Sequence, residues 1–231
     1  MWQACPEALF FEQITYNEGY NMRYLRIILW LACLAASPGA GGWWGQIQGQ
    51  NLGGGLSLGF NASQVDGDGV GGFRQVGLSL GGFVYYDLSD RLRFQPEVLF
   101  DQLGSRDRGG FFSLRTQHIT VPLLLSLQVP VDLGNGLHDI HFEAGPALGV
   151  LLMGRDNYTG ADYSATYRNP DLRVLGGFGY DLSARWAFHL RYGYSAISFL
   201  RTGNRPIYLR PDAPGLYHHY VTFSLRYHLS R

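Results

Sequence analysis

The residues that could bind a metal ion lie in two places along the chain. Asp66-Gly67-Asp68-Gly69 resembles the start of a calcium-binding loop, but the position that would supply the bidentate glutamate is Gly77. His218 and His219 are adjacent, and neighbouring residues of a strand point to opposite faces, so they cannot chelate one metal ion simply. We therefore predict an ordinary loop, interfacial or loop packing for the two histidines, and no metal site.

Nucleophilic catalysis would need a serine, aspartate or cysteine beside a histidine. Asp101 and His118 are residues of suitable types, but nothing in the sequence fixes their geometry. The cysteines are Cys5 and Cys33, which lie in a segment that we expect to be removed, so the mature chain would have no cysteine nucleophile, disulfide or cysteine-based zinc site. We predict a protein that is not an enzyme, with no catalytic residue and no cofactor.

The charged residues are balanced, with 18 basic and 18 acidic side chains, and every basic one is an arginine. A net charge of zero argues against a nucleic-acid partner, which would require a basic face. Several charged residues lie on the polar faces of segments in which polar and apolar residues alternate. We predict that these charges pair and fill the narrow interior of a barrel, and we favour this over a gate or a proton relay. This predicted lumen network comprises Arg93, Glu97, Asp101, Glu143, Arg173, His189, Arg191 and Arg226.

The elements that would position these residues are strands. In residues 217–230, Val221, Phe223 and Leu225 fall on one face and Arg226 on the other, which is the period of two of a strand with one apolar face. The composition agrees, because 32 glycines, 15 tyrosines and 14 phenylalanines favour strands and turns. Glycines on the inward face, such as Gly149, would relieve crowding opposite the arginines.

Eight segments show this alternation, and most are longer than the roughly 9–11 residues that a tilted strand needs to cross a bilayer. They cover residues 52–62, 73–88, 91–104, 113–130, 137–154, 171–182, 185–199 and 216–230. Short connections alternate with long ones along the chain, as in an outer-membrane barrel. The fold class predicted is therefore all-β, an eight-stranded antiparallel up-and-down transmembrane β-barrel. An even strand count places both termini at the short-turn, periplasmic end.

Two short turns repeat one another. Residues 86–91 read Tyr-Asp-Leu-Ser-Asp-Arg and residues 180–185 read Tyr-Asp-Leu-Ser-Ala-Arg. Aspartate and serine can bond nearby backbone N–H groups and hold a tight turn. We predict two equivalent periplasmic hairpin turns, which contain Asp87 and Ser89 in one copy and Asp181 and Ser183 in the other.

The first 42 residues have the pattern of an export signal. Within residues 22–42, two arginines precede an apolar run of about ten residues that is too short to span a bilayer, and small residues follow. Residues 1–21 are acidic and irregular, so we interpret them as a gene-model extension. The alternatives are an N-terminal helix on a soluble protein and a lipoprotein cysteine at Cys33. The barrel domain would be residues 43–231.

Periodicity alone does not say whether the apolar face of the strands points out of the barrel or into it. A soluble ligand-binding barrel in the periplasm, with an apolar interior, is therefore an alternative. Three features favour the membrane: the export signal, a polar face whose charges could pair in a lumen, and aromatic residues near both ends of the strands. Near the long loops, the predicted interfacial aromatics include Phe199 and Tyr220.

Four segments together resemble the outer-membrane β-barrel domain family that includes PorT-like proteins. They are residues 81–88, 94–100 with a central glutamate, 119–125 with Ile-Thr-Val-Pro-Leu-Leu, and 143–149 with Ala-Gly-Pro. The resemblance implies the fold and a place in the outer membrane, and it carries no catalytic motif.

We therefore predict a non-enzymatic outer-membrane barrel that acts as a structural, accessory or partner-binding component in secretion or envelope assembly. The alternative in the membrane is a narrow porin-like channel for small solutes or ions. The expected partners are outer-membrane lipid and lipopolysaccharide, the outer-membrane assembly machinery, and a protein bound through the long loops.

Overall fold

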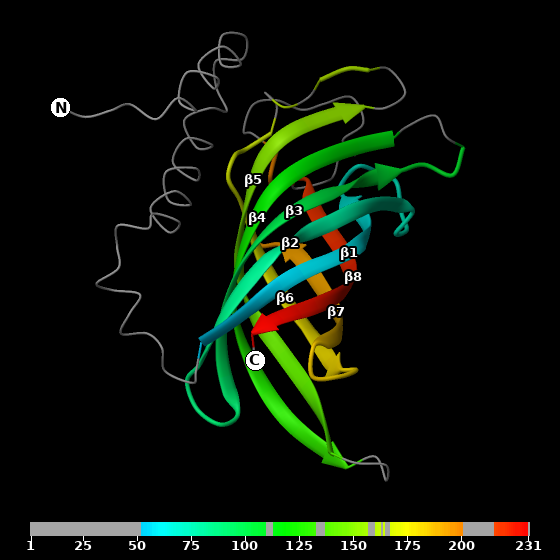
Figure 1. Ribbon diagram of the computed structural model, residues 1–231. Helices are drawn as coiled ribbons and strands as arrows, with labels where there is room; N and C mark the ends of the chain where they lie inside the picture. Colours follow the sequence, from blue (N-terminus) through cyan, green and yellow to red (C-terminus); the bar gives the residue numbers. More distant parts are fainter. Residues whose placement is uncertain are drawn as a thin grey trace, which may run out of the picture. The chain divides into compact units, whose positions relative to one another are not determined.

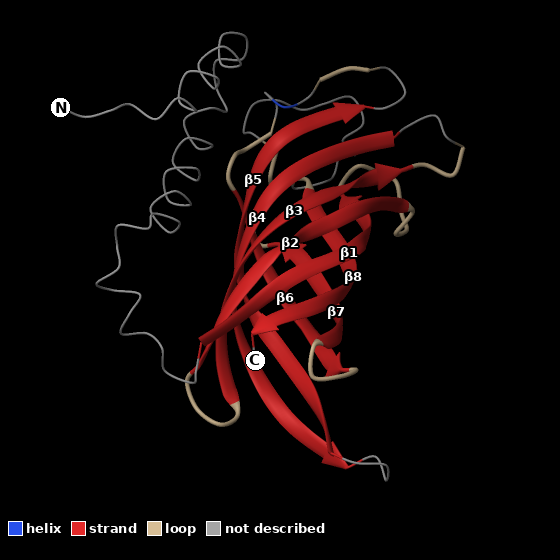
Figure 2. Cartoon of the chain, viewed as in Figure 1, coloured by secondary structure: helices blue, strands red, loops and turns tan. Residues whose placement is uncertain are grey.

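The computed structural model describes residues 52–109, 113–132, 137–156, 160–162, 164, 167–200 and 215–230. Eight antiparallel strands close into one barrel in sequence order, with β1 also paired to β8 (Figure 1, Figure 2). They are β1 (Leu52–Asp66), β2 (Gln75–Asp87), β3 (Leu92–Arg106), β4 (Ser113–Asp132), β5 (Leu137–Asp156), β6 (Asp171–Asp181), β7 (Trp186–Ser195) and β8 (Tyr217–Ser230). This confirms the predicted fold class. The predicted extension, export signal and first residues of the barrel domain lie outside the described residues.

The polar face of each strand points into the barrel. In β3, for example, Arg93, Gln95 and Glu97 are buried while Phe94 and Val98 between them are exposed. Because successive side chains of a strand alternate between faces, one strand supplies both the charged interior and the apolar exterior. The lumen is thus built from the residues that a soluble protein would place on its surface.

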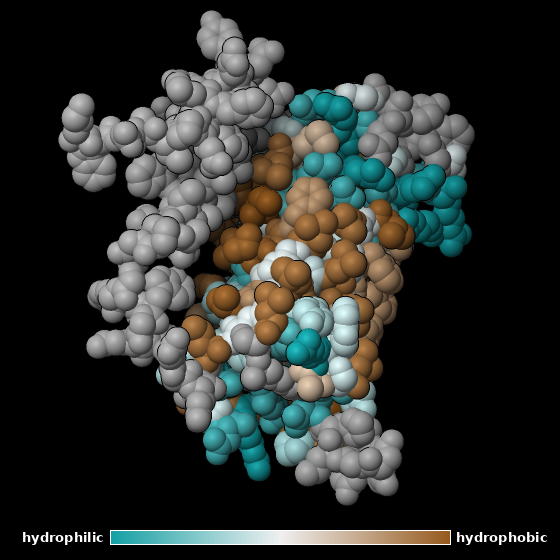
Figure 3. All heavy atoms as spheres, in the orientation of Figure 1, coloured by the Kyte–Doolittle hydropathy of each residue, from teal (hydrophilic) through white to brown (hydrophobic). Residues whose placement is uncertain are grey.

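Apolar side chains cover the outside of the barrel. Leu58 and Val76 are each 61% exposed, and Figure 3 shows a hydrophobic band across the wall between two hydrophilic ends. Such an exterior is suited to lipid, where a closed barrel satisfies its backbone hydrogen bonds between strands. The alternative of a soluble barrel with an apolar interior is therefore wrong.

Among the described residues, no helix is long and apolar enough to cross a membrane.

β7 and β8 depart from the prediction near the long loops. β7 stops at Ser195, four residues early, because the chain then bends and Phe199 turns inward, where it is 2% exposed. Tyr220 of β8 also faces the interior and is 2% exposed. Neither aromatic residue lies at the lipid interface as predicted. Parity explains Tyr220, since it shares a face with Thr222.

Candidate functional site

A layer of four charged side chains crosses the middle of the lumen. Glu97 of β3 and Glu143 of β5 face Arg191 of β7 and Arg226 of β8. Both arginines contact both glutamates, with N···O distances of 2.9 and 2.8 Å from Arg191 and 2.6 and 3.4 Å from Arg226. All four side chains are almost completely buried. We call this arrangement the central charge layer.

Neighbouring side chains complete the hydrogen bonding of the layer. Gln95 donates to Glu97 at 2.6 Å, and the His189 ring lies 3.5 Å from Glu143. The Arg226 guanidinium also lies over the Phe83 ring, 5.2 Å from its centroid. A buried ion pair persists only when further polar contacts offset the loss of hydration, and this layer has them.

A second polar group lies nearer the long loops. Asp171 accepts hydrogen bonds from Arg173 at 2.7 Å and from Ser195 at 3.1 Å, and it contacts His218 Nδ1 at 3.1 Å. The other ring nitrogen of His218 is 3.1 Å from the Thr116 hydroxyl. We call Thr116, Asp171, Arg173, Ser195 and His218 the upper cluster. It is structurally similar to a nucleophilic triad, because an acid, an imidazole and a hydroxyl follow one another.

The upper cluster is sealed from the loop side by apolar residues. Phe199 stacks on the His218 ring with centroids 4.0 Å apart. With five other buried side chains it forms a cluster that we call the apolar cap: Val65, Leu114, Leu151, Tyr167, Phe199 and Leu216. Because Thr116 is 0% exposed and lies next to this cap, no substrate can reach its hydroxyl without the cap opening.

A close approach to glycine lets one arginine fit inside the barrel. An added Cβ at Gly149 would lie 2.8 Å from the Arg173 guanidinium carbon, which is closer than real Cβ contacts. The guanidinium donates to Thr120 at 3.2 Å. The expected relief of crowding by an inward glycine is thus confirmed at this position.

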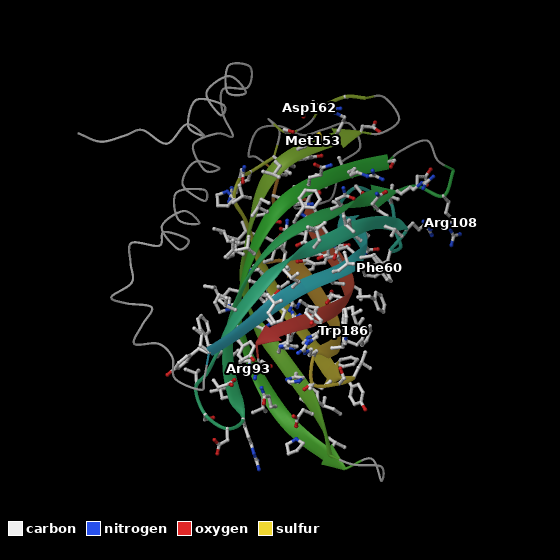
Figure 4. All side chains as sticks on the ribbon, in the orientation of Figure 1. Phe60, Arg93, Arg108, Met153, Asp162 and Trp186 are labelled. Carbon is white, nitrogen blue, oxygen red and sulfur yellow. The ribbon has the colours of Figure 1, made fainter. Side chains whose placement is uncertain are left out.

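The lumen near the short turns holds two further contacts to carboxylates. Arg93 contacts Asp87 at 2.6 Å, and His141 contacts Asp181 at 3.0 Å. Figure 4 places Arg93 near the short-turn end, away from Arg108 at the long-loop end. The two turn aspartates therefore point into the lumen, where one contacts an arginine and the other a histidine.

The turn serines bond to the backbone, as the sequence suggested they could. Ser89 accepts from the Leu92 N–H and Ser183 accepts from the Trp186 N–H, both at 3.1 Å. The same bond at the same spacing explains why residues 86–91 and 180–185 repeat one another.

In the structure, the residues of the predicted lumen network belong to several separate groups. Arg93 belongs to the turn-end pair with Asp87. Asp101 accepts from Ser79 at 2.7 Å and Asn61 at 3.1 Å, and among the described residues no arginine forms a hydrogen bond or ion pair with it. Asp101 and His118 are cross-strand partners in register, yet both ring nitrogens of His118 lack a hydrogen-bond partner among the described residues. They do not form an acid–base pair.

Of the upper cluster, sequence reasoning predicted Arg173 as a lumen residue and missed the other four members. Asp171, Ser195 and Thr116 were not singled out, and His218 was assigned to interfacial or loop packing. The available signal was strand parity, which puts His218 on the same face as Tyr220 and Thr222 and so in the lumen. His219 faces outward, where it contacts Tyr192 and Gln64.

The described lumen is therefore filled along its length. Charged layers occupy the middle and the turn end, and the apolar cap occupies the loop end. No group of three or more metal-binding side chains is found in the part of the chain that the structure describes.

A model of the outer membrane protein beta-barrel domain matches residues 46–201. The chain belongs to this outer-membrane β-barrel domain family. Solved structures with a similar fold include Ail of Yersinia pestis, at 11% identity over 78% of this chain and 100% of that chain, with a TM-score of 0.47. Neisserial surface protein A has 13% identity over 76% of this chain and 94% of that chain, with a TM-score of 0.39. OprG of Pseudomonas aeruginosa has 13% identity over 78% of this chain and 95% of that chain, with a TM-score of 0.36. No curated protein sequence matches the chain.

Membership of the outer-membrane barrel family agrees with the apolar exterior. The chain is an outer-membrane protein, and its hydrophobic band is suited to contact with lipid. The resemblance to PorT-like proteins is narrower than this family membership, and it concerns proteins with the same kind of barrel.

The loop between β1 and β2 contains a carboxyl group with a shifted pKa. Asp68 is 5% exposed, and burial raises its pKa from 3.8 to about 6, aided by the nearby Asp66 carboxylate. One carboxylate oxygen accepts from the Val70 N–H at 2.8 Å, while the other has no partner among the described residues. The protonated form is thus the one that the folded loop favours.

Stability is expected to fall as the pH rises through this interval. Between pH 4 and 6 the folded state holds the Asp68 proton and the unfolded state has lost it, so deprotonation destabilises the folded loop by about 1–3 kcal/mol. The measurement is the free energy of unfolding from pH 4 to 7 for the wild type and for Asp68→Asn, which is neutral throughout. The difference between the two should grow towards pH 7, and a difference that is constant with pH would contradict the assignment.

Proposed function

We propose that this outer-membrane barrel is a closed, non-enzymatic protein that acts through its long-loop end, as a structural or partner-binding component in secretion or envelope assembly. The observation that carries the proposal is the filled lumen. Glu97, Arg173, Arg226 and His218 have almost no exposed surface, although each faces the inside of the barrel. Side chains packed in this way support a role at the rim rather than transport through the lumen.

The orientation of the barrel is part of this proposal. β1 begins and β8 ends at the same end as the short turns, because Leu52 pairs with Tyr86 and Gly54 with Ser230. Short turns in outer-membrane barrels are periplasmic. We therefore assign both termini to the periplasm, where the assembly machinery would act, and the long loops to the cell surface, where a protein partner would bind.

Site-specific crosslinking in cells tests the partner role. A photoreactive residue at Arg168, which is exposed at the long-loop end, is expected to capture a stoichiometric partner. The control carries the same photoreactive residue at Asp90, which is exposed in a short turn at the opposite end of the barrel. Equal capture at both positions, or capture of the assembly machinery alone, would contradict a partner that binds through the long loops.

Planar bilayer recordings test the channel alternative on the same purified protein. We expect no steady single-channel current, because ions would have to cross the central charge layer and the apolar cap. Regular conductance steps would overturn the closed-barrel proposal in favour of a narrow channel. A Glu97→Gln variant that changed such steps would place the conduction path through the central charge layer.

A further inference from the structure

Arginines face outward at the long-loop end of four consecutive strands. Arg74 directly precedes β2, Arg106 ends β3, and Arg115 and Arg155 lie at the corresponding ends of β4 and β5. Each is next to a buried residue, so alternation puts the arginine on the outer surface. With Arg108 in the following loop, we call these five residues the arginine belt.

Two arginines of the belt lie directly opposite one another. Arg115 of β4 pairs in register with Arg155 of β5, and Gly104, the partner of Arg115 on β3, has no side chain. Like charges at directly opposed positions destabilise a sheet. A bound anion between the two guanidinium groups would remove this repulsion.

The described residues supply the belt with few counter-charges. No ion pair joins any of its five arginines to a described carboxylate, and the Nε atom of Arg115 is buried without a hydrogen-bond partner. Asp162 forms a backbone β-bridge with Arg155, and its carboxylate, which accepts from the Ser164 N–H at 2.8 Å, is the described carboxylate that attracts Arg155 electrostatically. Asp107 accepts from the Gly109 N–H at 3.2 Å.

A hollow adjoins the belt on the same side of the barrel. Its volume is about 520 Å³, and it is lined by Arg74, Arg106, Asp107, Arg108 and Gly109. Figure 4 shows Arg108 projecting from the long-loop end. Three guanidinium groups around one hollow can bind phosphate in the bidentate geometry that arginine favours.

The residues below the belt indicate that the anion is attached to a lipid. Moving down the outer face, the first row is Gln102 paired with Gln117, and the next is Phe100 paired with Ile119 and Leu80. Charge therefore gives way to amide and then to apolar side chains within four residues. This is the order of polarity at the boundary between headgroups and acyl chains.

We propose that the arginine belt binds the phosphate groups of a glycolipid in the outer leaflet, that is, the lipid A part of lipopolysaccharide. The proposal rests on the proposed orientation, because the long-loop end must face the outer leaflet. The apolar rows on β2–β4 contact the acyl chains, and the arginines neutralise the phosphates above them. This localises lipid binding to one side of the barrel.

The test uses the full barrel purified in a zwitterionic detergent and mixed micelles that contain diphosphorylated lipid A. Arg115→Gln combined with Arg155→Gln should weaken binding at least about tenfold, since two charge-assisted contacts are lost. The control is Arg91→Gln combined with Arg185→Gln, which removes the same charge at exposed sites at the short-turn end. It should bind like the wild type.

Two further probes identify the part of the lipid that is recognised. Dephosphorylated lipid A should bind the wild type at least about tenfold more weakly, because the contacts to phosphate are lost. Equal affinity for it, or an equal loss in both double variants, would overturn the proposal. Inorganic pyrophosphate that bound as tightly as the lipid would overturn the lipid assignment in favour of a soluble anion. Binding in micelles does not require a protein partner, so failure here is distinct from failure of the crosslinking test.

Discussion

Replacing Glu97 by glutamine is expected to destabilise the folded barrel by about 3–5 kcal/mol. The substitution keeps the size of the side chain but leaves Arg191 and Arg226 with Glu143 as their remaining carboxylate in the central charge layer. The excess positive charge is buried, so water cannot compensate for the lost partner. The measurement is the free energy of unfolding in urea, with the barrel reconstituted in lipid vesicles.

Two control variants test whether this loss of stability is specific to the central charge layer or follows from removing any charge in the lumen. Asp87→Asn breaks the pair with Arg93, but the Asp87 side chain is 32% exposed, so we expect a loss of about 0–1 kcal/mol. Combining Glu97→Gln with Arg226→Met restores the charge balance and should recover much of the stability lost in the single variant. If Glu97→Gln were as mild as Asp87→Asn, the central charge layer would be hydrated and the closed-barrel proposal would fail.

The second large effect is expected on the outer surface, where Leu58→Arg should destabilise the barrel by about 2–4 kcal/mol. Leu58 is 61% exposed near the middle of β1, and its partners in register are Leu80 and Leu225. A charge at this position would lie in the hydrocarbon of the membrane. The folded fraction and the free energy of unfolding in lipid vesicles measure the effect.

The matched control is Leu182→Arg, at a leucine that is 56% exposed in a short turn. An arginine there can reach water, so the expected loss is about 0–1 kcal/mol. Because the two leucines have similar exposure, a difference between them reports the surroundings of the side chain. Equal effects at Leu58 and Leu182 would contradict the assignment of the hydrophobic band to the lipid.

The sequence by itself determined the strands and their order. Alternation such as Val221-Thr222-Phe223 depends on local geometry, because successive side chains of a strand must point to opposite faces. Short and long connections then allow one arrangement of eight antiparallel strands, and lipid requires that sheet to close. The charged face, including Glu97 and Arg191, could likewise be assigned to one side of its strands without a structure.

The tertiary structure alone decided which charges meet, and it confirmed that the polar face points inward. Glu97 and Arg226 are 129 positions apart, and their contact depends on the register and tilt of the closed barrel, which no local pattern encodes. The same holds for the regrouping of Arg93 with Asp87 and for the contact of His218 with Asp171. Phe199 also turns inward only because the chain bends after β7. Alternation predicts the face of a side chain, whereas its partner depends on how distant strands align across the lumen.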